Sequence, residues 1–587
     1  MNAIASLRRL FAYLMIFPMM IGVATAGEEQ PVGFADKLDA HLSTFVTYLY
    51  DVVFVKVPIW GEHKVPVVLI FLVVTGVFMT IYFKFLNVRA FGLAIRTARG
   101  KYTPKDAPGQ ITHFQALTAA LSATVGLGNI SGVAIAVGIG GPGATFWMIM
   151  MALCGMTTKF CECTLGVKYR KIDAQGKVHG GGMYYLSQGL KERGLGKLGA
   201  VLAVFFAIMC IGSAIGAGNM YQVNQATTQM SQEFGLFIED IHFLGMDLPG
   251  SLVFGTIIAV IAGSVIIGGI VWIARVTSIL VPLMCGAYVI GALIIIFGNL
   301  EMVPGAFKSI LVGAFSSAAL GGGFIGALIQ GVTRGAFSNE AGFGSAPIAH
   351  SAVKTKKPAS EGLVALIEPF TDTVVVCTMT ALVLVITGAW NVDALTNKDE
   401  VALFKGPEAK VMVIDDLEQG SELSFVKAKV NADGNYSEVY KDSNPEETYW
   451  VANADIDVVE GIRRTSYAFQ QELPWFPGLL GVAVLLFAFS TMISWSYYGE
   501  QAVIYLCGRR IPGVVLAYKL MFCVFSVIGA VASLTNVLAI SDAMFFAMMV
   551  PNVFALFILL PVVKRELKDF QQHAADIDSG AKSVEDD

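Results

Sequence analysis

The chain has 587 residues, a mean hydropathy of +0.65 and only 14% charged residues. This composition excludes an ordinary water-soluble globule, which needs more polar side chain at its surface, and it indicates a polytopic membrane protein. The net charge of -5 excludes little, because the charges are unevenly distributed around the apolar stretches.

The first segment, 1–26, has the pattern of a secretory signal peptide. Arg8 and Arg9 precede an apolar run, and small residues at 24–26 end it. The run is short for a span and ends in a site typical of signal cleavage. We therefore expect a cleaved signal, with an uncleaved anchor as the alternative, followed by an extracytoplasmic amphipathic segment over 27–64.

Eleven further apolar stretches are long enough to cross about 30 Å of hydrocarbon. A leading span is followed by one set of five over 112–298 and a second set of five over 323–563. The predicted spans are 65–86, 112–138, 143–168, 196–228, 251–270, 275–298, 323–351, 361–388, 477–506, 511–533 and 540–563.

Lysine and arginine gather in alternate loops, which predicts the orientation. Short loops rich in these residues stay in the cytoplasm, so this side and the tail 564–587 are predicted to be cytoplasmic in the plasma (inner) membrane of a bacterium. The acidic loop 231–250 would face outward. The basic clusters are Arg89, Arg96, Arg99, Lys101 and Lys105; Lys168, Arg170, Lys171, Lys177, Lys191, Arg193 and Lys197; Lys354, Lys356 and Lys357; Arg509 and Arg510; and Lys564, Arg565 and Lys568.

The segment 391–474 loses the apolar pattern and becomes rich in Asp, Glu, Lys, Asn and Ser. Its short apolar or alternating pieces at 411–414 and 423–430 predict short strands in an extracytoplasmic insertion. All eight cysteines lie in or at the ends of spans and none lies in the insertion, so no disulfide framework is predicted.

Two spans are interrupted by glycines and polar residues. Gly126, Gly128 and Asn129 interrupt 112–138, and the run 331–347 with Arg334 and Glu340 interrupts 323–351. A bilayer tolerates such breaks only where the freed backbone groups face protein, water or a solute. Both breaks lie in the first span of a five-helix set, and breaks at corresponding positions of two halves are typical of a transporter site.

Several motifs closely resemble the alanine or glycine:cation symporter family. They are TVGLGNISGVA at 124–134, GGPGATFWM at 140–148, GAFSNEAGFGSAP at 335–347 and SWSYYGEQ at 494–501, with Ile149 as a small departure. The resemblance covers about 65–565. It implies an all-α LeuT-like fold, a 5+5 inverted repeat with one extra leading transmembrane helix, and sodium-coupled import of small neutral amino acids such as alanine and glycine.

The residues at the breaks suit an amino acid zwitterion. Backbone N–H groups near Gly128 and Asn129 begin the outer half-helix and favour a carboxylate, whereas the carbonyls of Thr124 and Val125 suit Na⁺ or an ammonium group. Asn224 is a further ammonium candidate, although it and Gln222 could instead form interhelical hydrogen bonds. The predicted substrate-binding residues are Thr124, Gly128, Asn129, Gln222, Phe337, Asn339 and Trp495.

Hydroxyl groups at 490–494 offer hard oxygen ligands, which favour an alkali cation. By similarity to the LeuT-like arrangement, Na⁺ would lie between these hydroxyls and the first break; the alternative is that the hydroxyls bond to their own helix. The predicted sodium ligands are Val125, Gly128, Ser490, Thr491 and Ser494. No cofactor besides the co-transported Na⁺, no nucleic-acid partner and no enzymatic activity is predicted.

Ionisable residues inside the spans are expected to form a structural network or gate. Arg334 and Glu340 would pair with each other or with an acid at 368, 372 or 500, and Glu340 leaves a proton-coupled role open. Lys159 and Glu162 are expected to be snorkelling or paired interface charges. A proton-coupled transporter, and a gated channel or substrate sensor, are the alternative functions.

Overall fold

The computed structural model describes residues 49–60, 63–237, 241–243, 246–316, 323–391, 461–508 and 513–584, together with strands between 394 and 458. The predicted signal peptide lies outside these residues. Within them, seven helices are long and apolar enough to span a membrane, or eight when a bent pair counts as one span. Three shorter apolar helices accompany them. These helices cover ten of the eleven predicted stretches, and the remaining stretch, 323–351, contains a separate helix over Gly323–Asn339.

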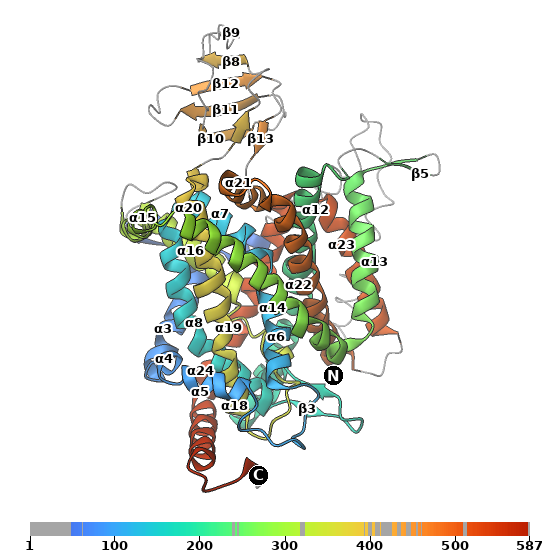
Figure 1. Cartoon of the computed structure of the whole chain (residues 1–587). Coiled ribbons are helices and arrows are strands. Elements are labelled where there is room, and N and C mark those ends of the chain that lie inside the picture. Colours follow the sequence, from blue (N-terminus) through green and yellow to red (C-terminus); the bar gives the residue numbers. More distant parts are fainter. Residues whose placement is uncertain are drawn as a thin grey trace.

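The leading helix and the first set follow the predicted order (Figure 1). The α11 and α12 segments form one long helix that contains a π-helical turn, η3. The elements are α3 (Val67–Tyr82), α6 (His113–Thr124), η1 (Leu127–Asn129), α7 (Ser131–Gly140), α8 (Gly143–Lys168), α11 (Gly196–Ile215), η3 (Gly216–Met220), α12 (Tyr221–Phe234), α13 (Gly250–Ile266) and α14 (Gly269–Gly298).

The second set again begins with an interrupted helix, and the predicted class of an all-α polytopic membrane protein is confirmed. A π-helical segment, η4, lies inside its second span. The elements are α16 (Gly323–Asn339), α17 (Pro347–His350), α18 (Pro358–Ala365), α19 (Ile367–Pro369), η4 (Phe370–Cys377), α20 (Thr378–Ile386), η5 (Ala389–Asn391), α22 (Phe476–Cys507), α23 (Val514–Val531) and α24 (Leu534–Asp578).

Short elements connect these helices. The helix α15 (Val303–Phe315), which lies between two predicted spans, packs on α8, where the Trp147 indole N–H donates to the Ala314 carbonyl at 3.1 Å. The remaining short elements are β1 (Lys56–Trp60), β2 (His63–Pro66), α4 (Leu86–Arg89), α5 (Phe91–Ala98), β3 (Lys171–Ile172), β4 (Val178–His179), α9 (Gly182–Tyr184), η2 (Tyr185–Gly189), α10 (Leu190–Glu192), β5 (Ile241–Phe243) and β6 (Met246–Leu248).

The polar insertion contains an antiparallel sheet that stands above the helices in Figure 1. Its strand order is β13-β7-β10-β11-β12-β8-β9. The predicted strands correspond to β9 and β10, whereas the end of the predicted insertion is helix α21 (Ile462–Glu472), whose Phe469 is buried and stacks on Phe476. The strands are β7 (Ala394–Thr396), β8 (Ala402–Lys405), β9 (Val411–Met412), β10 (Phe425–Val430), β11 (Tyr436–Lys441), β12 (Thr448–Ala452) and β13 (Ile456–Val458).

The C-terminal helix is longer than predicted. The predicted last span ends at 563 and the predicted tail begins at 564, but α24 continues to Asp578. Its last turns remain packed, because Phe570 contacts the Tyr102 ring edge-on and the His573 ring lies 3.2 Å from the Tyr102 carbonyl oxygen. Apolar contacts therefore extend this helix beyond the stretch that is hydrophobic enough to read as a span.

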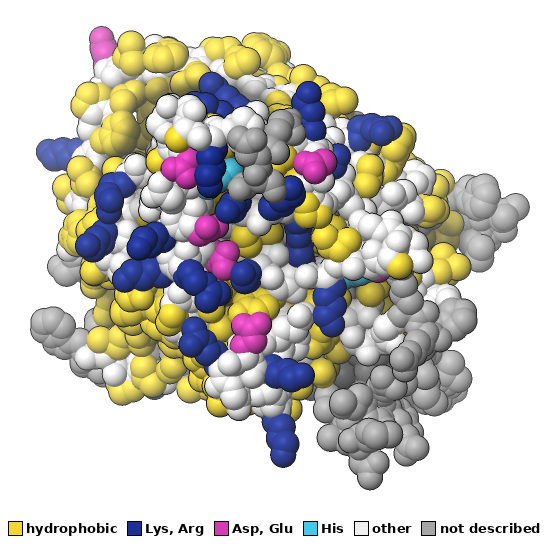
Figure 2. Space-filling model, turned by 90° about the horizontal axis from the view of Figure 1, so that it is seen from below, with side chains coloured by type: hydrophobic (Ala, Val, Ile, Leu, Met, Phe, Trp, Pro, Cys, Tyr) yellow, Lys and Arg dark blue, Asp and Glu magenta, His cyan; other side chains and the backbone are white. Residues whose placement is uncertain are grey.

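Where the structure describes them, the predicted basic loops lie on one face of the molecule, which we call the basic face (Figure 2). The predicted cluster of Arg509 and Arg510 lies outside the described residues. Arg170 joins three of them by donating to carbonyls of Pro108, Ser351 and Thr355, each at 2.8 Å. Lys168 pairs with Glu566, which brings the C-terminal cluster to the same face. The C-terminus emerges at this face, opposite the sheet of the insertion (Figure 1).

Candidate functional site

The first break separates α6 from α7 by a bend of 60°. The side chains of Asn129 and Gln222 hold it, because the Gly126 N–H donates to Asn129 Oδ1 at 2.9 Å and the Leu127 N–H donates to Gln222 Oε1 at 3.1 Å. Backbone N–H groups that have no acceptor within the interrupted helix are thus hydrogen-bonded inside the protein, as a membrane interior requires.

The second break follows α16. Glu340 has a φ of 56°, and Gly342 and Gly344 also have positive φ, which ends the helix until Pro347. The freed groups are again bound by buried side chains: the Gly344 N–H donates to Glu162 at 3.0 Å, and Asn552 donates to the Gly342 carbonyl at 2.7 Å. Glu162 on α8 therefore supports the break and is not an interface charge.

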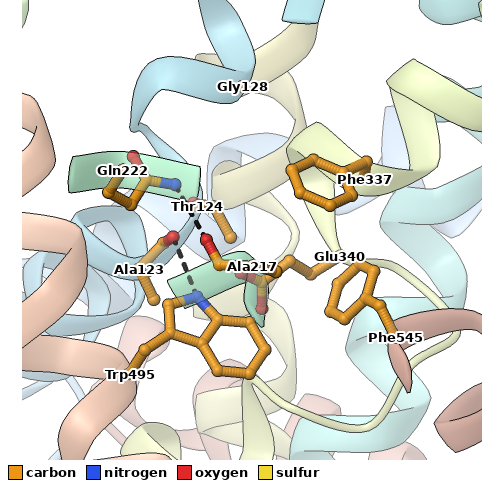
Figure 3. A pocket seen from close by; sticks show the side chains of 9 residues that line it. All are labelled: Ala123, Thr124, Gly128, Ala217, Gln222, Phe337, Glu340, Trp495 and Phe545. Atoms are coloured by element: carbon orange, nitrogen blue, oxygen red, sulfur yellow. Dashed lines mark hydrogen bonds between the residues drawn. The ribbon is translucent and has the colours of Figure 1, made fainter. Parts of the chain in front are cut away.

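A narrow pocket lies between the two breaks (Figure 3), with about 260 Å³ of empty space between its walls. Five of the seven predicted substrate residues line it. Four other lining residues were not predicted as substrate contacts. The complete lining is Ala123, Thr124, Gly128, Ala217, Gln222, Phe337, Glu340, Trp495 and Phe545.

Three aromatic rings form much of the pocket wall. The Phe545 ring packs edge-on against Phe337 and Trp495, with ring centroids 5.4 and 5.7 Å apart. The Trp495 indole N–H donates to the Ala123 carbonyl at 3.3 Å, close to the end of α6 (Figure 3). This bond fixes the ring beside the first break, so the wall and the break are parts of one structure.

The polar part of the pocket is small. Gln222 uses both ends of its amide within the protein, because its Nε2 donates to the Ala217 carbonyl at 3.0 Å inside η3 and its Oε1 binds the first break. Glu340 contributes the pocket's carboxylate and accepts a hydrogen bond from Ser345. The pocket thus combines a carboxyl group, the backbone of α6 and aromatic walls.

The two predicted asparagines do not line this pocket. Asn129 donates to Asp372 Oδ1 at 2.5 Å and to Ser338 Oγ at 3.0 Å. Asn339 accepts from the Ala341 N–H at 3.0 Å. Both side chains support the breaks from behind, because each amide satisfies local polar groups. Asn224 is also structural, since it donates to the carbonyl of Ala532 on the neighbouring helix at 2.8 Å.

The predicted sodium ligands separate into two groups. Within the described part of the chain, the buried Thr491 Oγ1 and Ser494 Oγ have no hydrogen-bond partner. Thr491 faces the first break, since a Cβ at Gly126 would lie 2.5 Å from its oxygen. Ser490 instead donates to the Phe487 carbonyl of its own helix at 3.0 Å. Two orphaned hydroxyls near the break fit a hard cation, whereas Ser490 follows the alternative of bonding to its own helix.

The buried charges have partners that the sequence analysis did not predict. Arg334 pairs with Asp542 on α24 and lies over the Phe337 ring, so the predicted pairing with Glu340 or with acids at 368, 372 or 500 is wrong. Lys159 is fully buried and pairs with Glu368 at 2.9 Å. It therefore does not snorkel to an interface.

Comparisons with known proteins agree on one group. Residues 50–407 and 448–583 match the profile of the sodium:alanine symporter family. The sodium/alanine symporter AgcS of Methanococcus maripaludis is 35% identical over 515 residues, covering 88% of this chain and 95% of that protein. An uncharacterized transporter of Haemophilus influenzae is 36% identical over 521 residues, with 88% and 94% covered.

A further relative carries a different substrate in its name. The probable sodium/glutamine symporter GlnT of Bacillus subtilis is 30% identical over 514 residues, covering 87% of this chain and 88% of that protein. Among solved structures, that of MhsT in complex with L-phenylalanine is similar with a TM-score of 0.42 and 12% identity, covering 78% of this chain and 99% of that chain.

Proposed function

Since the chain belongs to the sodium:alanine symporter family, we propose that it imports small neutral amino acids, alanine and glycine, together with Na⁺. The narrow pocket between the two helix breaks carries this proposal. The rings of Phe337, Trp495 and Phe545 narrow it, which favours a small solute.

The pocket chemistry supports a zwitterion with a short side chain. A carboxylate is expected near Gly128, where the outer half-helix begins, and an ammonium group is expected near Glu340. The rings of Phe337, Trp495 and Phe545 leave the side chain a short apolar space. A long polar side chain such as that of glutamine would have to displace one of these rings.

Sodium is proposed as a second substrate beside the first break. Thr491 and Ser494 would supply hydroxyl oxygens, and the backbone at Val125 and Gly128 would supply carbonyl oxygens. Gly128 lines the amino acid pocket as well, so binding of one substrate would order the backbone that the other needs. Shared ordering of this kind gives a positive and reciprocal coupling between two ligands.

Alternating access would follow from movement of the interrupted helices against the scaffold. We place the basic face and the C-terminus in the cytoplasm, in the plasma (inner) membrane of a bacterium, since contacts of Arg170 and Lys168 gather the basic loops on that face. Labelling of a single cysteine introduced at Lys568, by a reagent that does not cross the membrane, tests this orientation. Labelling of intact cells would overturn it.

Uptake into proteoliposomes tests the proposed function. The purified protein is given labelled alanine with an inward Na⁺ gradient and then with choline in place of Na⁺. We expect accumulation only with Na⁺, and much lower accumulation by Thr491→Ala at the same Na⁺ concentration. Equal uptake in the two buffers would overturn sodium coupling, and failure to transport any small neutral amino acid would overturn the proposed substrate class.

Proton coupling is a second candidate, which the position of Glu340 in the pocket favours. A carboxyl group beside the substrate can take up a proton in place of a metal cation. An inward pH gradient without Na⁺ tests this candidate in the same proteoliposomes. Accumulation driven by that gradient, and abolished in Glu340→Gln, would replace sodium by protons in the proposal.

A further inference from the structure

A second, larger pocket lies at the basic face, between the end of α5 and the beginning of α6. We call it the α5–α6 groove; it is open to the surface and holds about 1500 Å³ of empty space. It is separate from the substrate pocket, because the two share no lining residue. The groove is lined by Ile95, Ala98, Arg99, Gly100, Thr103, Pro104, Lys105, Thr112, His113, Phe114, Leu117, Lys354 and Ile367.

Three cations in the groove have no acidic partner. They are Arg99, Lys105 and Lys354, and among the residues that the structure describes no carboxylate lies within ion-pair distance of any of them. The lining of the groove also contains no acidic residue. Neighbouring cations on the same face are paired: Lys101 lies 2.8 Å from Asp578, and Lys357 lies 3.1 Å from Asp569. The groove therefore concentrates uncompensated positive charge, which attracts an anion.

The rest of the lining is apolar and partly open to the surroundings. The Phe114 side chain is 48% exposed and Ile95 is 36% exposed, and the wall continues with Leu117 and Ile367. A free inorganic anion would gain nothing from these side chains. A ligand that places an anionic group among the cations and a hydrocarbon chain along the wall would use both parts of the groove.

We propose that the α5–α6 groove binds an anionic phospholipid. The headgroup phosphate contacts Arg99, Lys105 and Lys354, and an acyl chain lies along Ile95, Phe114 and Leu117. Anionic headgroups are bound in this way by basic pockets between transmembrane helices. This inference does not rest on the proposed substrates, since lipid binding requires no transport.

The groove touches the part of the molecule that has to move during transport. The first turn of α6 lines it, and α6 is the inner half of the first interrupted helix. His113 in this turn also contacts Glu361, which ties α6 to α18 in this conformation. A lipid in the groove therefore packs against α6 and stabilises the position in which this contact forms.

Native mass spectrometry of the full-length protein in detergent tests the proposal. Phosphatidylglycerol is titrated in parallel with phosphatidylcholine and inorganic phosphate. We expect a saturable phosphatidylglycerol adduct, and for the triple variant R99Q/K105Q/K354Q an apparent Kd on the order of 100-fold higher, since each basic residue near an anionic headgroup contributes about fivefold.

A matched variant separates this site from general surface charge. K171Q/K191Q/K197Q removes three exposed cations of the basic loops that do not line the groove. It should bind phosphatidylglycerol like the parent protein. Equal binding of both lipids, or equal losses in both triple variants, would overturn the proposal. Competition by inorganic phosphate at similar concentration would reduce the groove to a simple anion site and also overturn it. If the first triple variant does not fold, the single change Lys105→Gln at an exposed residue provides the same comparison.

Discussion

Lys159 and Glu368 form an ion pair with 2.9 Å between Nζ and Oε1, and both side chains are completely buried. Glu368 Oε2 also lies 3.3 Å from His350 Nε2, and His350 Nδ1 lies 2.6 Å from Glu361 Oε1. An ionised carboxylate only accepts hydrogen bonds, and a neutral imidazole donates from one nitrogen. His350 between two carboxylates therefore requires an additional proton within this cluster, which offsets the negative charge that Lys159 leaves unbalanced on the two carboxylates.

Removal of one member of the Lys159–Glu368 pair should lower the stability of the protein much more than removal of both. Lys159→Met leaves a buried carboxylate without its cation and is expected to cost about 3–5 kcal/mol of stability. The double variant K159M/E368Q removes the orphan charge and should recover part of the loss. Thermal unfolding in detergent measures both. Lys101→Gln, in an exposed pair with Asp578, serves as the control and should not shift the melting temperature measurably.

The two glycines of the first break should respond differently to the same methyl group. A Cβ at Gly126 would lie 2.5 Å from Thr491 Oγ1 and 3.2 Å from Gln222 Oε1, so Gly126→Ala has to displace both side chains. At Gly128 the Cβ would meet the Phe337 ring at 3.5 Å, an ordinary contact. We expect Gly126→Ala to abolish transport, and Gly128→Ala to fold normally with a raised KM for alanine.

Uptake kinetics of the two variants, measured at equal amounts of folded protein, test whether Gly126→Ala impairs transport more than Gly128→Ala does. Folded protein is quantified by gel filtration of the purified variants. Normal transport by Gly126→Ala would contradict the close approach of Thr491 to the first break.

The neighbouring hydroxyls on α22 give a sharper test of the proposed sodium ligands. Thr491→Ala and Ser494→Ala remove oxygens that have no hydrogen-bond partner among the described residues, and each should raise the Na⁺ concentration for half-maximal uptake at least tenfold. Ser490→Ala removes a hydroxyl that already donates to the Phe487 carbonyl and the Met284 sulfur, and it should change this concentration less than twofold. A larger effect at 490 than at 491 would place the ion elsewhere.

The successes and failures of prediction from sequence have a common physical origin. Apolar stretches and their glycine-rich interruptions are local properties, so the helices and both breaks were predictable, as were strands β9 and β10. Partners are set by packing between distant segments. Nothing near Arg334 in the sequence indicates Asp542, which follows it by 208 residues.

The same distinction explains the site residues. Asn129 and Asn339 were predictable as special residues at a break, but whether an amide faces the pocket or the scaffold depends on the rotation of the helix. Phe545 lies on α24 with no unusual residue type to indicate its place in the pocket wall. The acid at 372 was visible as an intramembrane charge, but only the structure shows that it accepts a hydrogen bond from Asn129.

Arg170 should be irreplaceable by lysine. Burial lowers the pKa of Arg170 to about 10, which leaves it charged at neutral pH, and its two terminal nitrogens donate to four carbonyls around the loop 351–355. A lysine keeps the charge but lacks the planar fork. We expect Arg170→Lys to lower stability by about 3 kcal/mol. Trypsin should then cut faster after Lys354 and Lys356, with Arg193→Lys as the unaffected control.

Glu340 provides the most direct test of how the pocket recognises its substrate. It is the carboxylate that lines the pocket, and it stands at the end of α16 with a φ of 56°. Glu340→Gln keeps the size of the side chain and its capacity to accept from Ser345, while it removes the charge that would face the ammonium group. We expect the KM for alanine to rise at least tenfold while the Na⁺ concentration for half-maximal uptake stays within twofold, because the proposed sodium ligands lie on α22 and at the first break. Uptake at varied alanine and Na⁺ concentrations separates the two constants. A variant that keeps the parent KM would show that the ammonium group binds backbone carbonyls at the end of α6 instead, and a variant that loses sodium dependence would show that Glu340 belongs to the ion site.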